Sequence, residues 1–276
     1  MTKGLLGARR VREILERNGV RPQKSLGQNF VIDPNTIRKV IAAAGVGPQT
    51  DVLEIGAGAG SLTVGLAAEC RSVIAVEFDR RLIPVLEEVT KGYPNVNLVE
   101  ADVLELDLSD IAADNLVANL PYNIATPVVM RVLESAPQIS ALTVMTQREV
   151  GERMVAKPGS KIYGAPTVLA AYFCSARIAG RVSRRAFWPI PGVDSVIVRF
   201  SRKPRQPEVP YQLVQKVVRN AFSQRRKTLR NTLAGTFGAQ TPTETVLAEA
   251  GIEASARAEE IGLDGFVSLA RALLQD

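Results

Sequence analysis

The sequence predicts an α/β protein, a doubly wound and mostly parallel sheet followed by a small all-helical C-terminal domain. Short runs of Val, Leu, Ile and Ala alternate with helical patterns through the first 200 residues. A glycine-rich turn at 56–60 directly follows one of these runs. Beyond a stretch rich in proline and charge at 203–210, the apolar residues are spaced as in helices. We therefore expect a sheet domain at 1–203 and a helical domain at 204–276.

The expected elements follow in order. A basic N-terminal arm carries a helical pattern around Val11, Ile14 and Leu15, and should lie on the core or on RNA. Asp33 as N-cap, Pro34 at the first helical position and Gly45 beyond the end predict the next helix. Seven strands are expected at 51–55, 73–76, 96–99, 116–118, 141–145, 177–182 and 195–200. Helices are expected at 61–70, 80–89, 124–134, 147–156, 165–174, 211–221, 244–250 and 265–274.

The composition excludes several kinds of chemistry. The chain of 276 residues has no histidine, which rules out a histidine general base, a Ser-His-Asp triad and a histidine-ligated zinc. Cys70 and Cys174 lie far apart and form no metal or redox motif, so we expect no metal site. No run of 18 apolar residues exists, and the first 25 residues lack the apolar core of a secretory signal. We therefore expect a cytoplasmic protein that does not enter the membrane.

The net charge of +6 is unevenly distributed. Residues 177–237 contain 14 Lys and Arg but two Asp and Glu, a net charge of +12. The remainder, with 20 basic and 26 acidic residues, has a net charge of −6. Such a basic block predicts binding to a polyanion, first to nucleic acid and second to an acidic membrane surface. The alternative is a basic face that only contacts solvent.

The glycine-rich turn at 56–60 is open to two interpretations. A dinucleotide site would have G-x-G-x-x-G, but Ser61 occupies the sixth position. The pattern E-x-G-x-G-x-G, which starts at Glu54, instead resembles the S-adenosylmethionine site of Rossmann-like methyltransferases. Glu77, 21 residues after Gly56, and Asp102 each follow an expected strand. A carboxylate about 20 residues beyond the glycine turn suits a ribose diol, and Asp102 at the next strand end further strengthens the second interpretation.

The tetrapeptide N-L-P-Y at 119–122 lies between an expected strand and an expected helix, where open α/β sheets bind ligands. Asn119 offers an amide, and Pro121 biases Leu120 toward an extended backbone whose carbonyl can project. Tyr122 adds a flat ring. Two acceptors beside an aromatic ring suit a planar base with an exocyclic amine. An ordinary turn is the alternative, since Asn and Pro are common in turns.

A second aromatic segment, F-W-P-I-P-G-V-D-S, occupies 187–195. Two prolines stiffen this loop. Phe187 and Trp188 are adjacent and should point in different directions, so that one can stack on a base while the other packs inward.

The motifs taken together resemble the small-subunit ribosomal RNA adenine dimethyltransferase family, from about residue 10 to residue 270. They are Q-N-F-V-I-D (28–33), E-I-G-A-G-A-G (54–60), V-E-F-D (76–79), A-D-V-L (101–104), N-L-P-Y-N-I-A-T-P (119–127), F-W-P-I-P-G-V-D-S (187–195) and F-S-Q-R-R-K-T-L-R-N (222–231). The resemblance implies a Rossmann-like seven-stranded methyltransferase sheet. It further implies that two adjacent adenosines in a hairpin near the 3′ end of small-subunit (16S-type) rRNA are dimethylated, with S-adenosyl-L-methionine as donor. We expect a monomer that acts on the small ribosomal subunit.

The resemblance also implies roles for individual residues. The catalytic residues are Asn119, Leu120, Pro121, Tyr122 and Phe187, with Tyr122 and Phe187 stacking on the two faces of the target base. The cofactor residues are Gln28, Asn29, Val31, Glu54, Gly56, Gly58, Glu77, Phe78, Asp102, Val103 and Asn119. The residues that hold RNA phosphates are Arg184, Arg185, Arg225, Arg226, Lys227 and Arg230. Two positions depart from the family pattern, Gly192 in place of a common Lys and Ala125 in place of a common Ser.

Three alternative functions remain at the level of sequence. A large-subunit rRNA adenine methyltransferase that confers antibiotic resistance shares several motifs, but usually has Ile at the position of Leu120. A non-catalytic RNA-binding assembly factor would not need acceptors beside a base. An NAD dehydrogenase is disfavoured by Ser61 and by the lack of histidine.

Overall fold

The computed structural model describes residues 4–121, 124–204, 207–238 and 241–274. The chain forms two compact units. The first comprises Met1–Gly151 and Ala176–Arg202, and the second comprises Glu152–Ser175 and Lys203–Asp276.

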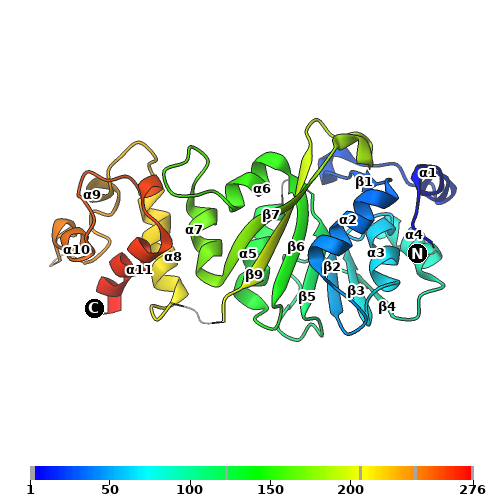
Figure 1. The fold of residues 1–276 in the computed structure, drawn as a ribbon, viewed down its shortest axis with the longest axis horizontal. Coiled ribbons are helices and arrows are strands. Elements are labelled where there is room, and N and C mark those ends of the chain that lie inside the picture. The colour runs from blue at the N-terminus through cyan, green and yellow to red at the C-terminus, as the bar shows by residue number, and fades with distance from the viewer. Residues whose placement is uncertain (1–3, 122–123, 205–206, 239–240, 275–276) are drawn as a thin grey trace. The chain divides into compact units, whose positions relative to one another are not determined.

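A seven-stranded sheet forms the centre of the first unit, in the order β4-β3-β2-β5-β6-β9-β7 (Figure 1). The strands are β2 (Asp51–Ile55), β3 (Ser72–Glu77), β4 (Val96–Glu100), β5 (Asn115–Asn119), β6 (Ala141–Gln147), β7 (Cys174–Val182) and β9 (Ser195–Arg202). Strands β2 to β6 pair in parallel, and β9 runs antiparallel to β6. All seven predicted strands are confirmed, and so is the Rossmann-like fold class.

The connecting helices of this unit are α2 (Pro34–Ala44), α3 (Ser61–Ala67), α4 (Ile83–Thr90), α5 (Ala125–Ser135) and α6 (Arg148–Met154), the last of which extends into the second unit. Helix α2 starts as predicted, because the Asp33 carboxylate accepts from the backbone N–H groups of Asn35 and Thr36. It ends at Gly45, which adopts a left-handed conformation. Helix α3 ends at Ala67, three residues earlier than predicted.

The order of the strands places a switch point between β2 and β5. The chain passes from β2 outward to β3 and β4, and then returns to pair β5 with the other side of β2. Because these strands are parallel, their carboxyl ends meet at one edge of the sheet. Ligands of open α/β sheets bind in the crevice at such a point. Gly56, Glu77, Asp102 and Asn119 all lie at this edge.

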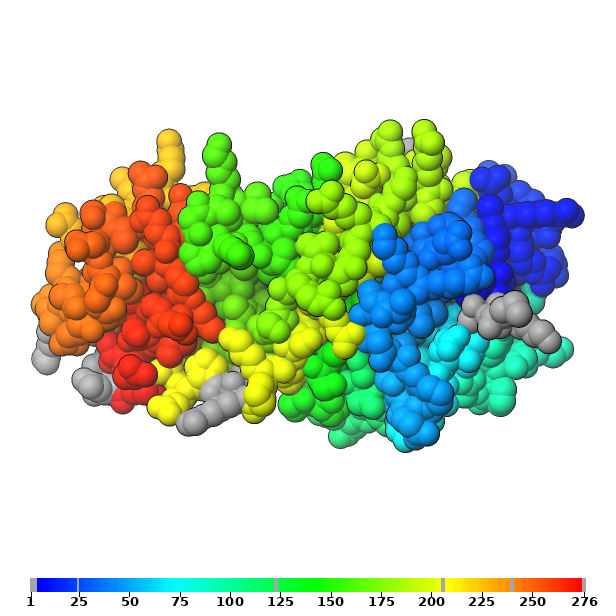
Figure 2. All heavy atoms as spheres, viewed as in Figure 1, coloured from blue at the N-terminus to red at the C-terminus, as the bar shows by residue number. Residues whose placement is uncertain are grey.

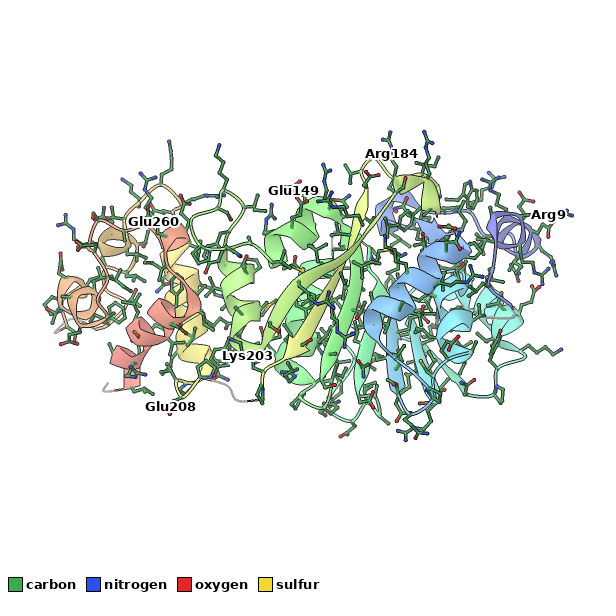
Figure 3. The ribbon with its side chains drawn as sticks, viewed as in Figure 1. Arg9, Glu149, Arg184, Lys203, Glu208 and Glu260 are labelled. Atoms are coloured by element: carbon green, nitrogen blue, oxygen red, sulfur yellow. The ribbon has the colours of Figure 1, made fainter. Side chains whose placement is uncertain are left out.

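The N-terminal arm is folded onto the first unit. Helix α1 (Ala8–Arg17) buries Val11, Ile14 and Leu15 in a cluster with Val64 and Val85. Its polar face is exposed, and Arg9 points away from the core (Figures 2 and 3). The sequence predicts that this arm lies on the core or on RNA, and its apolar face lies on the core.

Two short strands were not predicted. Strand β1 (Phe30–Val31) pairs antiparallel with β8 (Phe187–Trp188), in the register Phe30 to Trp188 and Val31 to Phe187. This ribbon joins segments that lie more than 150 residues apart in the chain. No local pattern can reveal a two-residue strand whose partner is so distant.

The second unit contains α7 (Ala165–Phe173), α8 (Tyr211–Ala221), α9 (Leu229–Thr232), α10 (Thr243–Glu249) and α11 (Leu263–Arg271). The expected division at 203 and 204 therefore needs one correction, because Glu152–Ser175 groups with the C-terminal helices. The reason is an aromatic cluster, in which the Tyr172 and Phe173 rings lie 5.3 and 4.7 Å from that of Tyr211. The Tyr172 hydroxyl also donates to the Val209 carbonyl at 2.9 Å.

Candidate functional site

A cavity of about 230 Å³ opens at the switch point of the sheet. Every residue that the sequence assigned to the cofactor lines it, namely Gln28, Asn29, Val31, Glu54, Gly56, Gly58, Glu77, Phe78, Asp102, Val103 and Asn119. Leu120 and Pro121 line the same cavity. The fold thus brings together residues from several segments that lie far apart in the chain.

The glycine-rich turn forms the floor of this cavity. Gly56 and Gly58 have positive φ angles of 74° and 60°, which favour glycine over other residues. A Cβ on Gly58 would lie 3.2 Å from the ring of Phe30, which is tighter than ordinary contact. Glycine at this position therefore accommodates the Phe30 ring, and the close approach of a ligand to this turn stays a prediction.

Glu77 ends β3 with its carboxylate held by the backbone. Its Oε2 accepts from the Gly58 N–H at 2.7 Å, and its Oε1 accepts from the N–H groups of Phe78 at 3.0 Å and Asp79 at 2.9 Å. Burial raises the pKa of Glu77, and these three donors oppose that rise. A carboxylate has about four acceptor positions, so Oε2 keeps one for a ligand hydroxyl.

Glu54 is the most deeply buried carboxyl group of the cavity, with only 1% of its surface exposed. Burial raises its pKa to about 8, and the nearby Glu77 adds to the rise while the Thr63 hydroxyl opposes it. Its Oε2 has no hydrogen-bond partner among the described residues. Buried polar groups are rarely left unpaired, so this oxygen is suited to a donor supplied by a ligand.

Asp102 follows β4 in a loop that the rest of the unit holds in place. Its Oδ1 accepts from the Leu104 N–H at 2.9 Å. Arg131 of α5 donates to the carbonyls of Val103 at 3.1 Å and Leu106 at 2.8 Å, which fixes the loop on the sheet. In the described part of the chain the structure records no donor to Asp102 Oδ2, which is left for a ligand.

The end of β5 supplies two acceptors. Asn119 donates from Nδ2 to the Asn29 carbonyl at 3.3 Å, so its Oδ1 is the atom left to accept. The Leu120 N–H donates to the Met145 carbonyl at 3.1 Å, while no residue within the described ranges donates to the Leu120 carbonyl. Tyr122, predicted to stack on the base, lies outside the described residues.

The prediction that Phe187 stacks on a base is wrong for this structure. Phe187 is only 1% exposed and packs in the core with Val31 and Ile37. Its pairing with Val31 across the β1–β8 ribbon turns the ring inward, and the adjacent Trp188 is the one that is partly exposed. Arg12 lies over the Trp188 ring, 5.6 Å from its centroid. Among the described residues that line the cavity, Phe78 has an exposed ring, at 60% exposure.

The predicted RNA-binding residues are all exposed and come from both units. Arg184 and Arg185 lie in a single 3-10 turn of the first unit, and Arg184 projects from its surface (Figure 3). Arg225, Arg226, Lys227 and Arg230 belong to the second unit, where Arg225 pairs with Glu259 at 3.2 Å. Gly192 is exposed, and its carbonyl accepts from Arg184 Nη1 at 3.2 Å.

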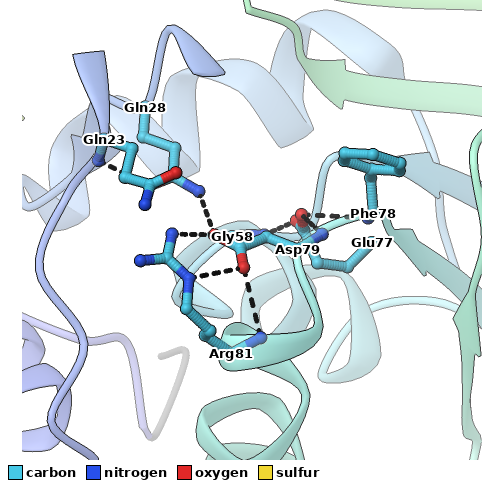
Figure 4. A network of polar contacts seen from close by, with 7 residues as sticks. All are labelled: Gln23, Gln28, Gly58, Glu77, Phe78, Asp79 and Arg81. Carbon is cyan, nitrogen blue, oxygen red and sulfur yellow. Dashed lines mark hydrogen bonds and ion pairs between the residues drawn. The ribbon is translucent and has the colours of Figure 1, made fainter. Parts of the chain in front are cut away.

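Asp79 lines the cavity, and the sequence assigned neither Asp79 nor its partner Arg81. Asp79 is 8% exposed and accepts from the Arg81 side chain and from Gln28 Nε2, the latter at 2.7 Å (Figure 4). Arg81 holds the pKa of Asp79 below its usual range. The sequence does contain a signal for this pair. Asp79 stands at the start of a helical pattern, two residues before Arg81, and an Asp at that place is typical of an N-cap.

Two features are absent from the described residues. No cluster of three or more Cys, Asp or Glu side chains is arranged to hold a metal ion. Within the same residues, every helix is too short or too polar to cross a membrane.

Comparison with known sequences identifies relatives along almost the full chain. The family model described as "Ribosomal RNA adenine dimethylase" matches residues 19–274. The "Ribosomal RNA small subunit methyltransferase A" of Paenarthrobacter aurescens is 43% identical, covering 97% of this chain and 94% of its own. The protein of the same name from Rhodococcus opacus is 44% identical, over 96% of this chain and 94% of its own.

Solved structures with the same fold include members of two related classes. A dimethyladenosine transferase from Plasmodium falciparum is 27% identical with a TM-score of 0.77, covering 87% of this chain and 95% of its own. The 23S rRNA methyltransferase ErmE is 28% identical with a TM-score of 0.71, over 90% of this chain and 100% of its own. The fold is therefore common to a protein named as a dimethyladenosine transferase and to one named as a 23S rRNA methyltransferase.

Proposed function

Because this chain belongs to the ribosomal RNA adenine dimethylase family, we propose that it dimethylates N6 of two adjacent adenosines in small-subunit rRNA. The methyl donor is S-adenosyl-L-methionine, the product is N6,N6-dimethyladenosine, and the target is a hairpin near the 3′ end of the RNA. The reaction belongs to ribosome biogenesis in the cytoplasm. The observation that carries the proposal is the position of Asn119 and Leu120, whose free acceptors line the same cavity as the glycine-rich turn.

The residues of the cavity fit this cofactor. The unpaired Oε2 of Glu54 suits the ammonium group of the methionine portion. Glu77 would accept from the ribose hydroxyls, and Asp102 would accept from the adenine amine. Gly56 and Gly58, which line the cavity, would lie beside the chain between ribose and ammonium. When bound, S-adenosyl-L-methionine supplies an electrophilic methyl group on a positively charged sulfur.

Asn119 and Leu120 make the target nitrogen reactive. An adenine N6 is a poor nucleophile, because its lone pair is delocalised into the ring. In the first transfer, the Asn119 Oδ1 and the Leu120 carbonyl each accept one N6–H, which localises the lone pair and directs it at the methyl group. Positioning of this kind supplies the main catalytic effect, since it converts the encounter into a step within one complex. Transfer of the methyl group from the sulfur leaves a positively charged ammonium at N6, which is acidic enough to lose a proton to water, so no histidine is required.

The exposed arginines and lysine supply affinity for the RNA backbone. Arg184 and Arg185 on the first unit and the basic segment 225–230 on the second contact phosphates. Such contacts carry no sequence information, so the shape of the RNA provides most of the selectivity. The target base is unstacked from its neighbours before it enters the cavity.

The alternative with a specific observation in its favour is methylation of large-subunit rRNA. It rests on the similarity of this fold to ErmE. The small-subunit function is better supported, because relatives at 42–44% identity share one name over at least 94% of this chain. The C-terminal sequence Q-R-R-K-T-L-R-N at 224–231 favours the same choice.

The replacement Asn119→Ala tests the catalytic assignment. We expect the rate of methyl transfer to fall on the order of 100-fold or more, while cofactor affinity stays within a few-fold of wild type. Asn115→Ala, at the other end of β5, is the matched control and should retain the wild-type rate. Calorimetry gives the cofactor affinity, and transfer of a radiolabelled methyl group to small subunits gives the rate. Full turnover in Asn119→Ala would remove the role assigned to this side chain.

A further inference from the structure

The segment Gln23–Asn29 borders the cavity, and the side chain of Gln28 joins this segment to Asp79. The Gln28 Nε2 donates to Asp79 Oδ2 at 2.7 Å, and its Oε1 accepts from the Gln23 N–H at 2.8 Å. The Gln28 N–H also donates to the Gln23 carbonyl at 3.2 Å. Figure 4 shows the amide of Gln28 placed between the start of its own segment and the wall formed by Glu77–Asp79.

The partner of Gln28 is rigid and charged. Asp79 is buried, and Arg81 donates to both of its oxygens, through Nε at 2.9 Å and through Nη2. Arg81 holds the pKa of Asp79 below its usual range, so the carboxylate is ionised at neutral pH. The bond from Gln28 is therefore assisted by charge and is stronger than a bond between two neutral groups. Asp79 is joined to Glu77 through its own N–H, which donates to Glu77 Oε1.

The residue after Gln28 reaches the catalytic end of the cavity. The Asn29 carbonyl accepts from Asn119 Nδ2 at 3.3 Å, and this bond decides which atom of the Asn119 amide is left as acceptor. Asn29 is itself held by a bond from its Nδ2 to the Gly27 carbonyl at 3.0 Å. A movement of the segment would therefore release the amide of Asn119 as well as one wall of the cavity.

We propose that Gln28 is a positioning residue, which holds Gln23–Asn29 against Asp79 and thereby orients Asn119 for the target amine. The resemblance gave Gln28 as a cofactor residue, whereas the contacts show its amide committed to Asp79 and Gln23. Gln28 thus acts through Asp79 and Asn29. The inference rests on the proposed function only for the role of Asn119, because the contacts themselves do not depend on it.

This arrangement couples the part of the cavity that binds the cofactor to Asn119, which binds the target amine. A cofactor that contacts Glu77 and Asn29 stabilises Gln23–Asn29 in its position against Asp79. In that position the segment orients the Asn119 oxygen. By linkage, loss of the Gln28 bond weakens cofactor binding and also lowers the rate at saturating cofactor. A residue with a merely structural role would lower stability and leave both of these quantities unchanged at a temperature where the protein is folded.

The experiment compares Gln28→Ala and Gln28→Glu with Gln23→Ala, all in the full-length protein. Gln23→Ala is the matched control, because the recorded contacts of Gln23 involve only its backbone. Calorimetry gives the affinity for S-adenosyl-L-methionine, hydrogen exchange gives the opening of 23–29, and single-turnover methylation gives the rate at saturating cofactor. We expect roughly tenfold losses in affinity and rate for Gln28→Ala, with faster exchange of the segment. Gln28→Glu should be worse, since it sets a second carboxylate against Asp79.

A double variant, in which the amide and the carboxylate exchange places, distinguishes the positioning role from general damage to the structure. Combining Gln28→Glu with Asp79→Asn restores an amide–carboxylate bond with the roles reversed, and should recover part of the lost affinity. If Gln28→Ala matches Gln23→Ala in affinity, exchange and rate, or changes only the melting temperature, the positioning role is overturned. Failure of the wild type to methylate RNA would instead remove the proposed function, while cofactor affinity and exchange would still decide whether Gln28 holds the segment.

Discussion

At the level of single residues, Glu54 links the cavity to the pH dependence of stability. Burial raises its pKa from 4.5 to about 8, so the folded protein binds a proton that the unfolded chain releases above pH 4.5. The contribution of Glu54 to the free energy of unfolding is therefore fully present below about pH 4.5 and is lost as the pH rises toward 8. The loss is on the order of a few kcal/mol, at about 1.4 kcal/mol for each pKa unit.

The replacement Glu54→Gln should remove this dependence. We expect the free energy of unfolding of the wild type to fall between pH 5 and pH 8, and that of Glu54→Gln to fall less, because Glu77 remains. Urea unfolding at four pH values measures both. A parallel pH dependence in the two proteins would show that Glu54 is not the buried proton site.

The meeting of Glu77, Asp102 and Asn119 at one cavity could be predicted, because their positions follow from the sheet. Glu77, Asp102 and Asn119 lie at or just after the carboxyl ends of parallel strands, and such ends share one edge whatever the details of packing. The direction of a side chain in the 187–195 loop follows no such rule. Which of Phe187 and Trp188 faces inward depends on the register of the β1–β8 ribbon, and that register is set by tertiary contacts.

At the level of elements, helix α1 is part of the core rather than a free arm. Leu15 is completely buried in the cluster that also contains Val64 of α3. Leu15→Ala should therefore lower the free energy of unfolding by about 2–5 kcal/mol, as for other large-to-small replacements in cores. The neighbouring exposed residue provides the control, Glu16→Ala, which should change stability by less than about 0.5 kcal/mol. Equal stabilities of the two variants in urea would contradict the packing of α1.

The elements that could be predicted are those with a long local pattern. The seven strands of the main sheet and helix α2 have apolar runs or caps that are readable from the sequence. The grouping of α7 with the C-terminal helices was missed, because it depends on rings that meet across some 40 residues of chain. Cys174 was expected to end a helix but begins β7, since an apolar run of that length does not distinguish the two structures.

At the level of the whole molecule, the basic residues concentrate in 177–237, whereas the remainder has a net negative charge. If this region binds RNA phosphates, replacing Arg225, Arg226 and Lys227 together with Gln should weaken binding to small subunits. The slope of log K against log salt should decrease in magnitude by roughly two units, because each phosphate that is no longer neutralised lowers it by about 0.7–0.9. Filter binding at several salt concentrations measures this slope.

The control for that experiment removes the same charge elsewhere. Arg9, Arg71 and Arg80 are exposed and pair with Glu13, Asp51 and Glu100. Replacing these three with Gln should leave the slope close to that of the wild type. If both triple variants reduce the slope equally, net charge rather than the basic segment governs RNA binding.

Nucleoside mass spectrometry tests the central claim most directly. The protein and S-adenosyl-L-methionine would be incubated with unmodified small ribosomal subunits and, in parallel, with protein-free large-subunit RNA. We predict N6,N6-dimethyladenosine in the small subunit alone, at two adjacent adenosines near the 3′ end of its RNA. Product in the large-subunit RNA alone, or RNA binding without product in either sample, would contradict the proposed function.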